Sequence, residues 1–175
     1  DWANQHFPQV SINLYSGKDW MTDHLDQWSQ EEARITGEKP LILPLLDPLL
    51  DMTKPLHKLL LIGEAEEIQA LYRAISTDDF PSTAFYLSKA NYLEVTAKHV
   101  SKEDALVELA NHYHLSLEEV LTMGDNFNDL PMLKKAGIGV AMGNAPQEVK
   151  EGAAVVTKTN NENGAGQAVE TYVLI

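Results

Sequence analysis

Short apolar runs alternate with helix-like stretches over the second half of the chain, and this alternation most constrains the fold. Ser101 followed by Asp104 is typical of a helix start, and the apolar spacing after it predicts a helix to about residue 114. Short strands that alternate with helices favour a parallel, doubly wound sheet. The remaining expected elements are strand 120–123, helix 130–136, strand 138–142, a helix opened by Asn144 and Pro146, strand 153–157 and helix 166–174.

The first half of the chain has a less regular pattern. Residues 20–34 predict a helix that carries acidic side chains, and residues 41–51 are apolar but broken by prolines, which predicts a loop or a poor helix. Residues 83–87 and 91–95 predict two strands of a hairpin. Further elements are expected as strands at 11–15 and 57–63 and an amphipathic helix at 66–75.

The change in pattern predicts an α/β protein of two domains, residues 1–92 and residues 93–175. A chain of 175 residues is long enough for two small domains, and a hydrophobic content of 44% can form packed cores. The net charge of −13 disfavours nucleic acid and anionic membranes as partners. There is no cysteine, which excludes disulfides, thiolate metal sites and cysteine nucleophiles. No apolar run approaches the ~18 residues of a membrane span, and no signal peptide is evident, so we expect a cytoplasmic protein.

The most informative motif is GDNFND at residues 124–129, which follows a predicted strand and precedes a predicted helix. A strand that ends in Gly-Asp places a carboxylate at the carboxyl edge of the sheet, where open α/β sheets bind ligands. Asp125 and Asp129 are therefore candidate metal ligands, and their oxygen donors suit Mg²⁺. The alternative is that Asp125 caps the following helix, because aspartate is also a common helix cap.

Two further positions accompany this motif. Lys102 lies at the first position of a predicted helix, where the helix dipole disfavours a cation, which gives mild support for a ligand role. Taken alone, the position is still better explained as a solvent-exposed surface lysine. The run at residues 140–145 is a strand, a glycine turn and the amide Asn144, a candidate for the substrate pocket. Taken alone, this run is explained as an ordinary strand-to-helix turn.

Together, these motifs resemble the C-terminal half of a Cof-type phosphatase of the haloacid dehalogenase (HAD) superfamily. The matching pieces are residues 100–102, GDNFNDLPML, GVAMGNA, and the Asn-rich segment at 159–164. The resemblance implies a partial Rossmann-like core at 93–175 and an α/β cap domain at 1–92. It also implies that Lys102 binds the transferring phosphoryl group and that Asp125 binds Mg²⁺. Asp129 matches the second acid of the motif, which would bind a metal-bound water or orient the lysine, and Asn128 would bond to phosphate or to the nucleophile.

One part of the family pattern has no match in this sequence. In the family, the nucleophile and the general acid belong to an N-terminal DxDGT motif, and residues 47–51 differ from it in spacing and composition. We therefore expect that an N-terminal segment outside this sequence is needed to complete the core. The 175-residue chain alone is expected to lack the covalent nucleophile and to be inactive.

The resemblance implies a Mg²⁺-dependent phosphatase of small phosphorylated metabolites, foremost sugar phosphates, that works through an aspartyl-phosphate intermediate. A second hypothesis is a fragment of the phosphorylation domain of a P-type ATPase, which carries a run similar to residues 124–143. A third is a non-catalytic binding module. In the first half, several side chains are candidates to face a sugar or a phosphate, although packing explains each of them better: Tyr15, Trp20, His24, Tyr86, Lys89 and Tyr92.

Overall fold

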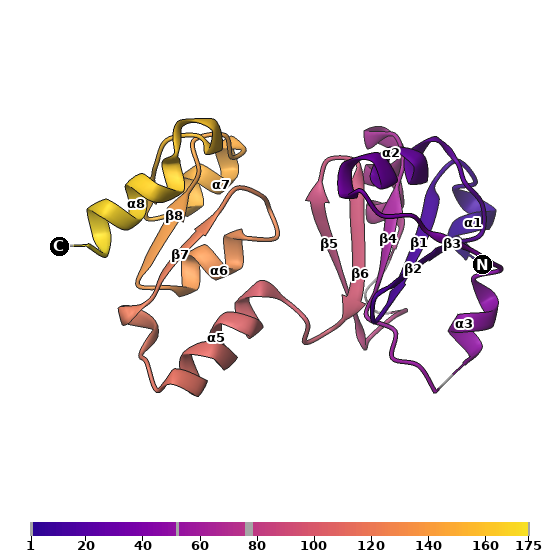
Figure 1. Ribbon diagram of the computed structural model, residues 1–175, viewed down its shortest axis with the longest axis horizontal. Helices are drawn as coiled ribbons and strands as arrows, with labels where there is room; N and C mark the ends of the chain where they lie inside the picture. Colours follow the sequence, from indigo (N-terminus) through magenta and orange to yellow (C-terminus); the bar gives the residue numbers. More distant parts are fainter. Residues whose placement is uncertain (1, 52, 76–78, 175) are drawn as a thin grey trace. The chain divides into compact units, whose positions relative to one another are not determined.

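The structure is a computed structural model that describes residues 2–51, 53–75 and 79–174 (Figure 1). The chain forms two compact units, Asp1–Lys98 and His99–Ile175. The division falls later than the expected boundary between residues 92 and 93, because the strand that begins at Tyr92 pairs with the sheet of the first unit. Among the described residues, the helices are all too short or too polar to cross a membrane.

The first unit contains a six-stranded sheet with the order β3-β2-β1-β4-β6-β5 (Figure 1). All neighbours pair antiparallel except β2 and β3, which are parallel. The parallel arrangement expected from strand–helix alternation therefore does not extend to this unit. The strands are β1 (Ser11–Ser16), β2 (Asp19–Thr22), β3 (Leu41–Ile42), β4 (Lys58–Ile62), β5 (Thr83–Lys89) and β6 (Tyr92–Ala97).

Helices pack on both faces of this sheet. One face packs against α4 (Ala65–Ala74), where Ile68 and Leu71 join Leu61 and Leu93 in a fully buried core. The other face packs against α2 (Gln27–Thr36) through Trp28. Two short helices, α1 (Trp2–His6) and α3 (Leu46–Leu50), complete the unit.

The expected helix over residues 20–34 is wrong in its first part. Residues 19–22 form β2, which pairs with β1 across a tight turn where Gly17 adopts a φ of 60°. Such a left-handed conformation favours glycine, so the turn was encoded in the sequence. The helix begins only after Asp26, whose side chain accepts hydrogen bonds from the backbone N–H groups of Trp28 (2.9 Å) and Ser29 (2.8 Å).

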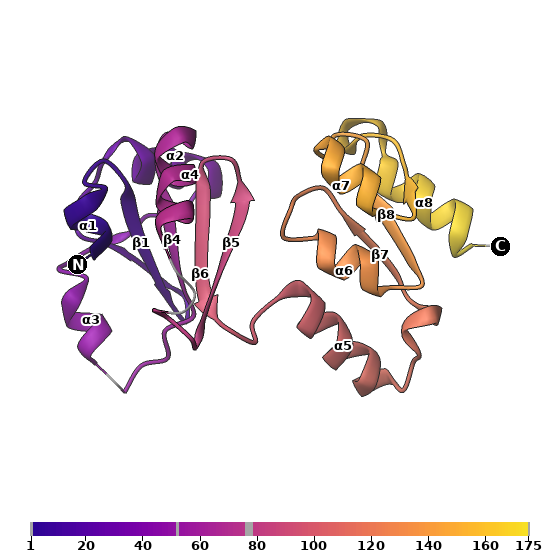
Figure 2. The ribbon, with the colours of Figure 1, turned by 180° about the vertical axis from the view of Figure 1, so that it is seen from behind.

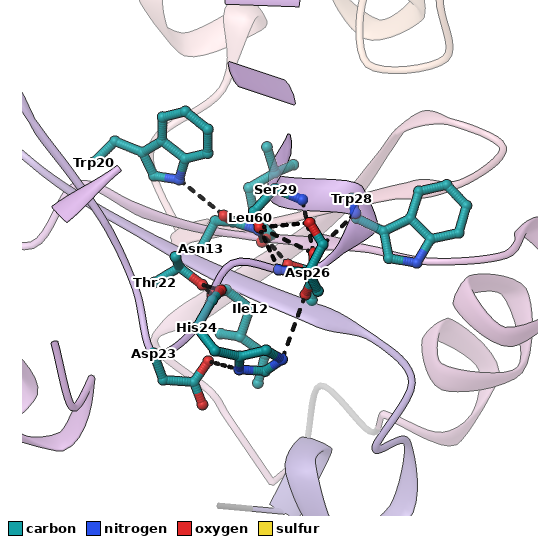
Figure 3. A network of polar contacts seen from close by, with 11 residues as sticks. Ile12, Asn13, Trp20, Thr22, Asp23, His24, Asp26, Trp28, Ser29 and Leu60 are labelled. Carbon is teal, nitrogen blue, oxygen red and sulfur yellow. Dashed lines mark hydrogen bonds and ion pairs between the residues drawn. The ribbon is translucent and has the colours of Figure 1, made fainter. Parts of the chain in front are cut away.

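A buried polar network lies on the face of the sheet that α2 covers (Figure 3). The indole Nε1 of Trp20 donates to Asn13 Oδ1 at 2.8 Å, and Asn13 Nδ2 donates to Ser11 Oγ at 3.2 Å. Trp20 and Tyr92 are 6% and 8% exposed. For these two candidates, packing is therefore the role that the structure shows.

Tyr92→Phe is expected to destabilise the first unit by about 1–3 kcal/mol, because it leaves a buried acceptor without its donor. The hydroxyl of Tyr92 donates to Glu32 Oε2 at 2.8 Å, and both residues are buried. Burial and then the bond to Glu32 raise the pKa of Tyr92. This stabilisation is complete below the ordinary tyrosine pKa of about 10 and is lost only as the pH rises through the folded-state value.

Urea unfolding at neutral pH measures this effect. The matched variant Tyr72→Phe removes a hydroxyl from α4 of the same unit, where the tyrosine is 39% exposed, and should cost less. Equal losses in the two variants would contradict the importance of the Tyr92–Glu32 bond.

The second unit contains a three-stranded parallel sheet with the order β7-β8-β9. Figure 2 labels two of its strands, β7 and β8. The parallel sheet predicted for this half is confirmed, and so is the α/β class. The strands are β7 (Leu121–Gly124), β8 (Ile138–Ala141) and β9 (Val155–Val156). The helices are α5 (Lys102–Tyr113), α6 (Leu130–Lys135), α7 (Gln147–Gly152) and α8 (Gly164–Tyr172), with single 3₁₀ turns η1 (Leu117–Glu119) and η2 (Asn160–Glu162).

Candidate active site

The candidate site lies at the carboxyl edge of the parallel sheet in the second unit. Because β7, β8 and β9 run in the same direction, the loops that follow them meet at one edge. Asp125 follows β7, Asn144 follows β8, and Asn160 lies in the segment after β9. The sheet therefore brings together polar residues that are far apart in the sequence.

Asp129 is the centre of this arrangement. Its Oδ2 accepts hydrogen bonds from the backbone N–H groups of Asp125 (2.8 Å) and Asn126 (2.9 Å), and its Oδ1 forms an ion pair with Lys102 Nζ. Its side chain is only 5% exposed. Both carboxylate oxygens are thus occupied by contacts that hold the loop after β7 and orient the lysine.

The position of Asp129 requires glycine at position 124. A Cβ added to Gly124 would lie 2.7 Å from Asp129 Cγ, which is closer than side chains approach. The Asp129 side chain makes no hydrogen bond that caps α6, although the residue occupies the N-cap position. The carboxylate bonds to the loop after β7 instead, so Asp129 does not act as a side-chain cap of α6.

Lys102 reaches the site from the first turn of α5. Ser101 is the N-cap of this helix, and its Oγ accepts a hydrogen bond from the backbone N–H of Asp104 at 2.9 Å, as the sequence predicted. The cap fixes where the helix begins, so Lys102 is its first residue. Its side chain is half-exposed, with the ammonium group against Asp129. Half of the side chain is exposed to solvent, so an anion can approach it.

Asp125 offers oxygen atoms to a cation. Its Oδ2 accepts a hydrogen bond from Asn144 Nδ2 at 3.0 Å, and its Oδ1 accepts a longer one from Asn126 Nδ2 at 3.4 Å. Each carboxylate oxygen can accept more than one bond, so both keep capacity for a metal ion. An oxygen-only donor set of this kind fits Mg²⁺, which takes one or two carboxylates and fills its other positions with water and phosphate. Within residues 2–51, 53–75 and 79–174, no three acidic or histidine side chains group as a metal site.

Asn128 and Asn144 differ from simple helix caps. The side chain of Asn128 is half-buried and, within the described part of the chain, makes no hydrogen bond, so it could bond to a ligand. The expectation that Asn144 caps the next helix is wrong, because the N-cap of α7 is Pro146. The amide of Asn144 lies instead between Asp125 and the backbone N–H of Asn160.

Sequence reasoning missed two contributors to this site. Asn126 gives its backbone N–H to Asp129 and its amide to Asp125. Asn160 gives its backbone N–H to Asn144 at 3.0 Å. Asn126 lies inside the motif, and the Asn-rich segment around Asn160 follows a predicted strand. Their position just after the end of a strand is the feature of the sequence that could have identified both residues.

Carboxylates and a lysine thus meet at the carboxyl edge of a parallel sheet, the edge at which open α/β sheets bind ligands. The family of haloacid dehalogenase-like hydrolases matches residues 1–169, and the chain belongs to this family. The family resemblance inferred from the motifs is therefore confirmed.

Individual proteins are also similar to the chain. A protein of Haemophilus influenzae that carries the name "Putative phosphatase" is 40% identical over 164 residues, which are 93% of this chain and 60% of that protein. The 5-amino-6-(5-phospho-D-ribitylamino)uracil phosphatase YcsE of Bacillus subtilis is 42% identical over 87 residues, covering 50% of this chain and 35% of that protein. The crystal structure of a haloacid dehalogenase-like hydrolase from Bacteroides thetaiotaomicron superposes with a TM-score of 0.77 at 32% identity, covering 97% of this chain and 64% of that one. The chain thus spans less than two thirds of the length of each of these relatives.

Proposed function

We propose that this chain is part of a Mg²⁺-dependent phosphatase that hydrolyses small phosphorylated metabolites, foremost sugar phosphates, in the cytoplasm. The observation that carries the proposal is the contact between Lys102 and Asp129 beside Asp125, which puts a cation and a metal-binding carboxylate at one sheet edge. Two relatives have names that include phosphatase. One of them is named for a phosphorylated ribityl compound, which supports the sugar-phosphate class.

Asp125 would hold the Mg²⁺ ion directly, and the bound ion would neutralise charge on the phosphate oxygens. Lys102 would contact the transferring phosphoryl group through its half-exposed side chain. Asp129 would orient Lys102 and keep the loop in place, and it would reach the metal only through a bound water. The side-chain amide of Asn128 makes no hydrogen bond within the described part of the chain, and it would donate one to the phosphate or to the nucleophile.

The proposed nucleophile is an aspartate in a segment outside this sequence. Its carboxylate would attack phosphorus as the bond to the substrate oxygen breaks and the leaving alkoxide takes a proton from a general acid. Water would then hydrolyse the aspartyl phosphate, releasing inorganic phosphate and restoring the carboxylate. Residues 1–92 would act as the cap domain that selects the substrate.

The hypothesis of a P-type ATPase fragment is not favoured, because the matched family is one of hydrolases and the relatives are named as phosphatases. A non-catalytic module of the same fold is distinguished by an assay. The natural full-length protein should hydrolyse p-nitrophenyl phosphate and a panel of sugar phosphates with Mg²⁺ and lose turnover with EDTA. Absence of turnover with all of these esters at saturating Mg²⁺ would favour the binding module.

A further inference from the structure

The amide of Asn144 connects two loops at the candidate site. Its Nδ2 donates to Asp125 Oδ2 at 3.0 Å, and its Oδ1 accepts from the backbone N–H of Asn160 at 3.0 Å. Asp125 follows β7 and Asn160 begins η2 after β9, so one side chain joins the two outer strand-end loops across the middle one. Neither the family motifs nor the spacing in the sequence assigns such a connection.

The two ends of a carboxamide are chemically different, and this difference gives the contact a direction. The oxygen accepts hydrogen bonds and the nitrogen donates them. A backbone N–H can only donate, so the N–H of Asn160 requires the oxygen of Asn144 to face it. The nitrogen of Asn144 must then face Asp125. Reversing the amide would place its oxygen against the carboxylate and its NH₂ group against another donor.

The N–H of Asn160 is itself held by a rigid segment. The backbone N–H of Gly143 donates to the carbonyl oxygen of Lys158 at 3.0 Å, and a Cβ on Gly143 would lie only 2.8 Å from the backbone nitrogen of Thr159. Glu162 accepts hydrogen bonds from the backbone N–H (3.2 Å) and the hydroxyl (2.6 Å) of Thr159. The donor that orients Asn144 is therefore fixed by backbone packing and by the capping box of η2.

We propose that Asn144 is a positioning residue that orients the Asp125 carboxylate for Mg²⁺, and that the backbone N–H of Asn160 orients Asn144. This inference rests on the proposed function, because it takes Asp125 as the metal ligand. A donor beside a ligating carboxylate fixes which rotamer and which lone pairs the metal meets, and removing such outer contacts typically weakens metal binding about 10- to 100-fold.

A pair of variants at position 160 isolates the backbone donor. Asn160→Pro removes the N–H that binds Asn144, and the extended conformation of Thr159 (φ −69°, ψ 164°) is compatible with a following proline. Asn160→Ala removes the side chain, which accepts from the N–H of Asn161, but keeps the backbone donor. In the natural full-length protein, calorimetric titration with Mg²⁺ should show roughly tenfold weaker binding for Asn160→Pro and for Asn144→Ala. Asn160→Ala should bind Mg²⁺ within about twofold of the wild type.

Kinetics and thermal unfolding separate positioning from structural damage. In the two weakened variants, the half-saturating Mg²⁺ concentration should rise while kcat at saturating Mg²⁺ returns close to the wild-type value. If Asn160→Pro fails to fold, Asn144→Ala tests the same contact. Wild-type Mg²⁺ affinity in Asn144→Ala, or an equal loss in Asn160→Ala and Asn160→Pro, would overturn the inference. A wild-type protein that binds no Mg²⁺ would instead refute the proposed function.

Discussion

Replacing Lys102 by alanine should lower kcat of the natural full-length phosphatase by at least about a hundredfold. The ammonium group lies against Asp129 at the sheet edge, in a position set by the cap of α5. Charge on the phosphate oxygens develops in the transition state, and a fixed cation that meets this charge lowers the barrier more than it strengthens substrate binding. The loss should therefore appear in kcat and in kcat/KM together.

Steady-state kinetics at saturating Mg²⁺ measures this loss, and two further variants interpret it. Lys102→Met keeps the apolar stem and should lose as much activity as Lys102→Ala. Lys134→Ala removes an exposed lysine from α6 and should leave kcat within about twofold, as most surface substitutions do. A rise in KM with unchanged kcat would show that Lys102 lies at the periphery of the reaction.

Asp125→Ala should reduce turnover by about a thousandfold or more, because loss of the metal removes several kcal/mol of transition-state stabilisation. The fold should survive this change. Asp125 contributes its backbone N–H to Asp129, and alanine keeps that N–H. The side chain itself is only half-buried and accepts from two amide groups that can bond to water instead.

Three measurements on the natural full-length protein test this expectation: Mg²⁺ affinity by calorimetry, turnover of a phosphate ester, and Tm. Asp125→Asn provides a control of the same shape without the charge, and it should also lose Mg²⁺ affinity. Normal turnover in Asp125→Ala would exclude Asp125 as the metal ligand. A collapse of Tm without metal would show that the residue is structural.

The second unit could be predicted from the sequence almost element by element. Its strands are short apolar runs separated by helices with clear starts, as at Ser101, and they pair in chain order as β7-β8-β9. The first unit was harder because its sheet is antiparallel. Residues 20–22 read as part of a helix when taken with the acidic stretch that follows, and only pairing with β1 makes them a strand.

The candidate site was predictable in its residues, but among its contacts only the one between Asp129 and Lys102 was implied, as an alternative, by the family resemblance. Motif position indicated Lys102, Asp125 and Asp129, and the structure places all three at one edge. The ion pair joins Lys102, the first residue of α5, to Asp129, the N-cap of α6, and no local spacing encodes it. The link from Asn160 through Asn144 likewise depends on the packing of loops after separate strands.

The contacts of Asp129 have a thermodynamic consequence for ligand entry. Two loop amides and one lysine are already bonded to a buried carboxylate before any ion or phosphate arrives. Fixing the backbone of one residue costs roughly 1–2 kcal/mol of conformational free energy. For the loop residues bonded to Asp129, this ordering already occurs when the sheet folds. Binding should therefore be accompanied by little loss of chain entropy, and its free energy should be governed by the exchange of water for oxygen ligands.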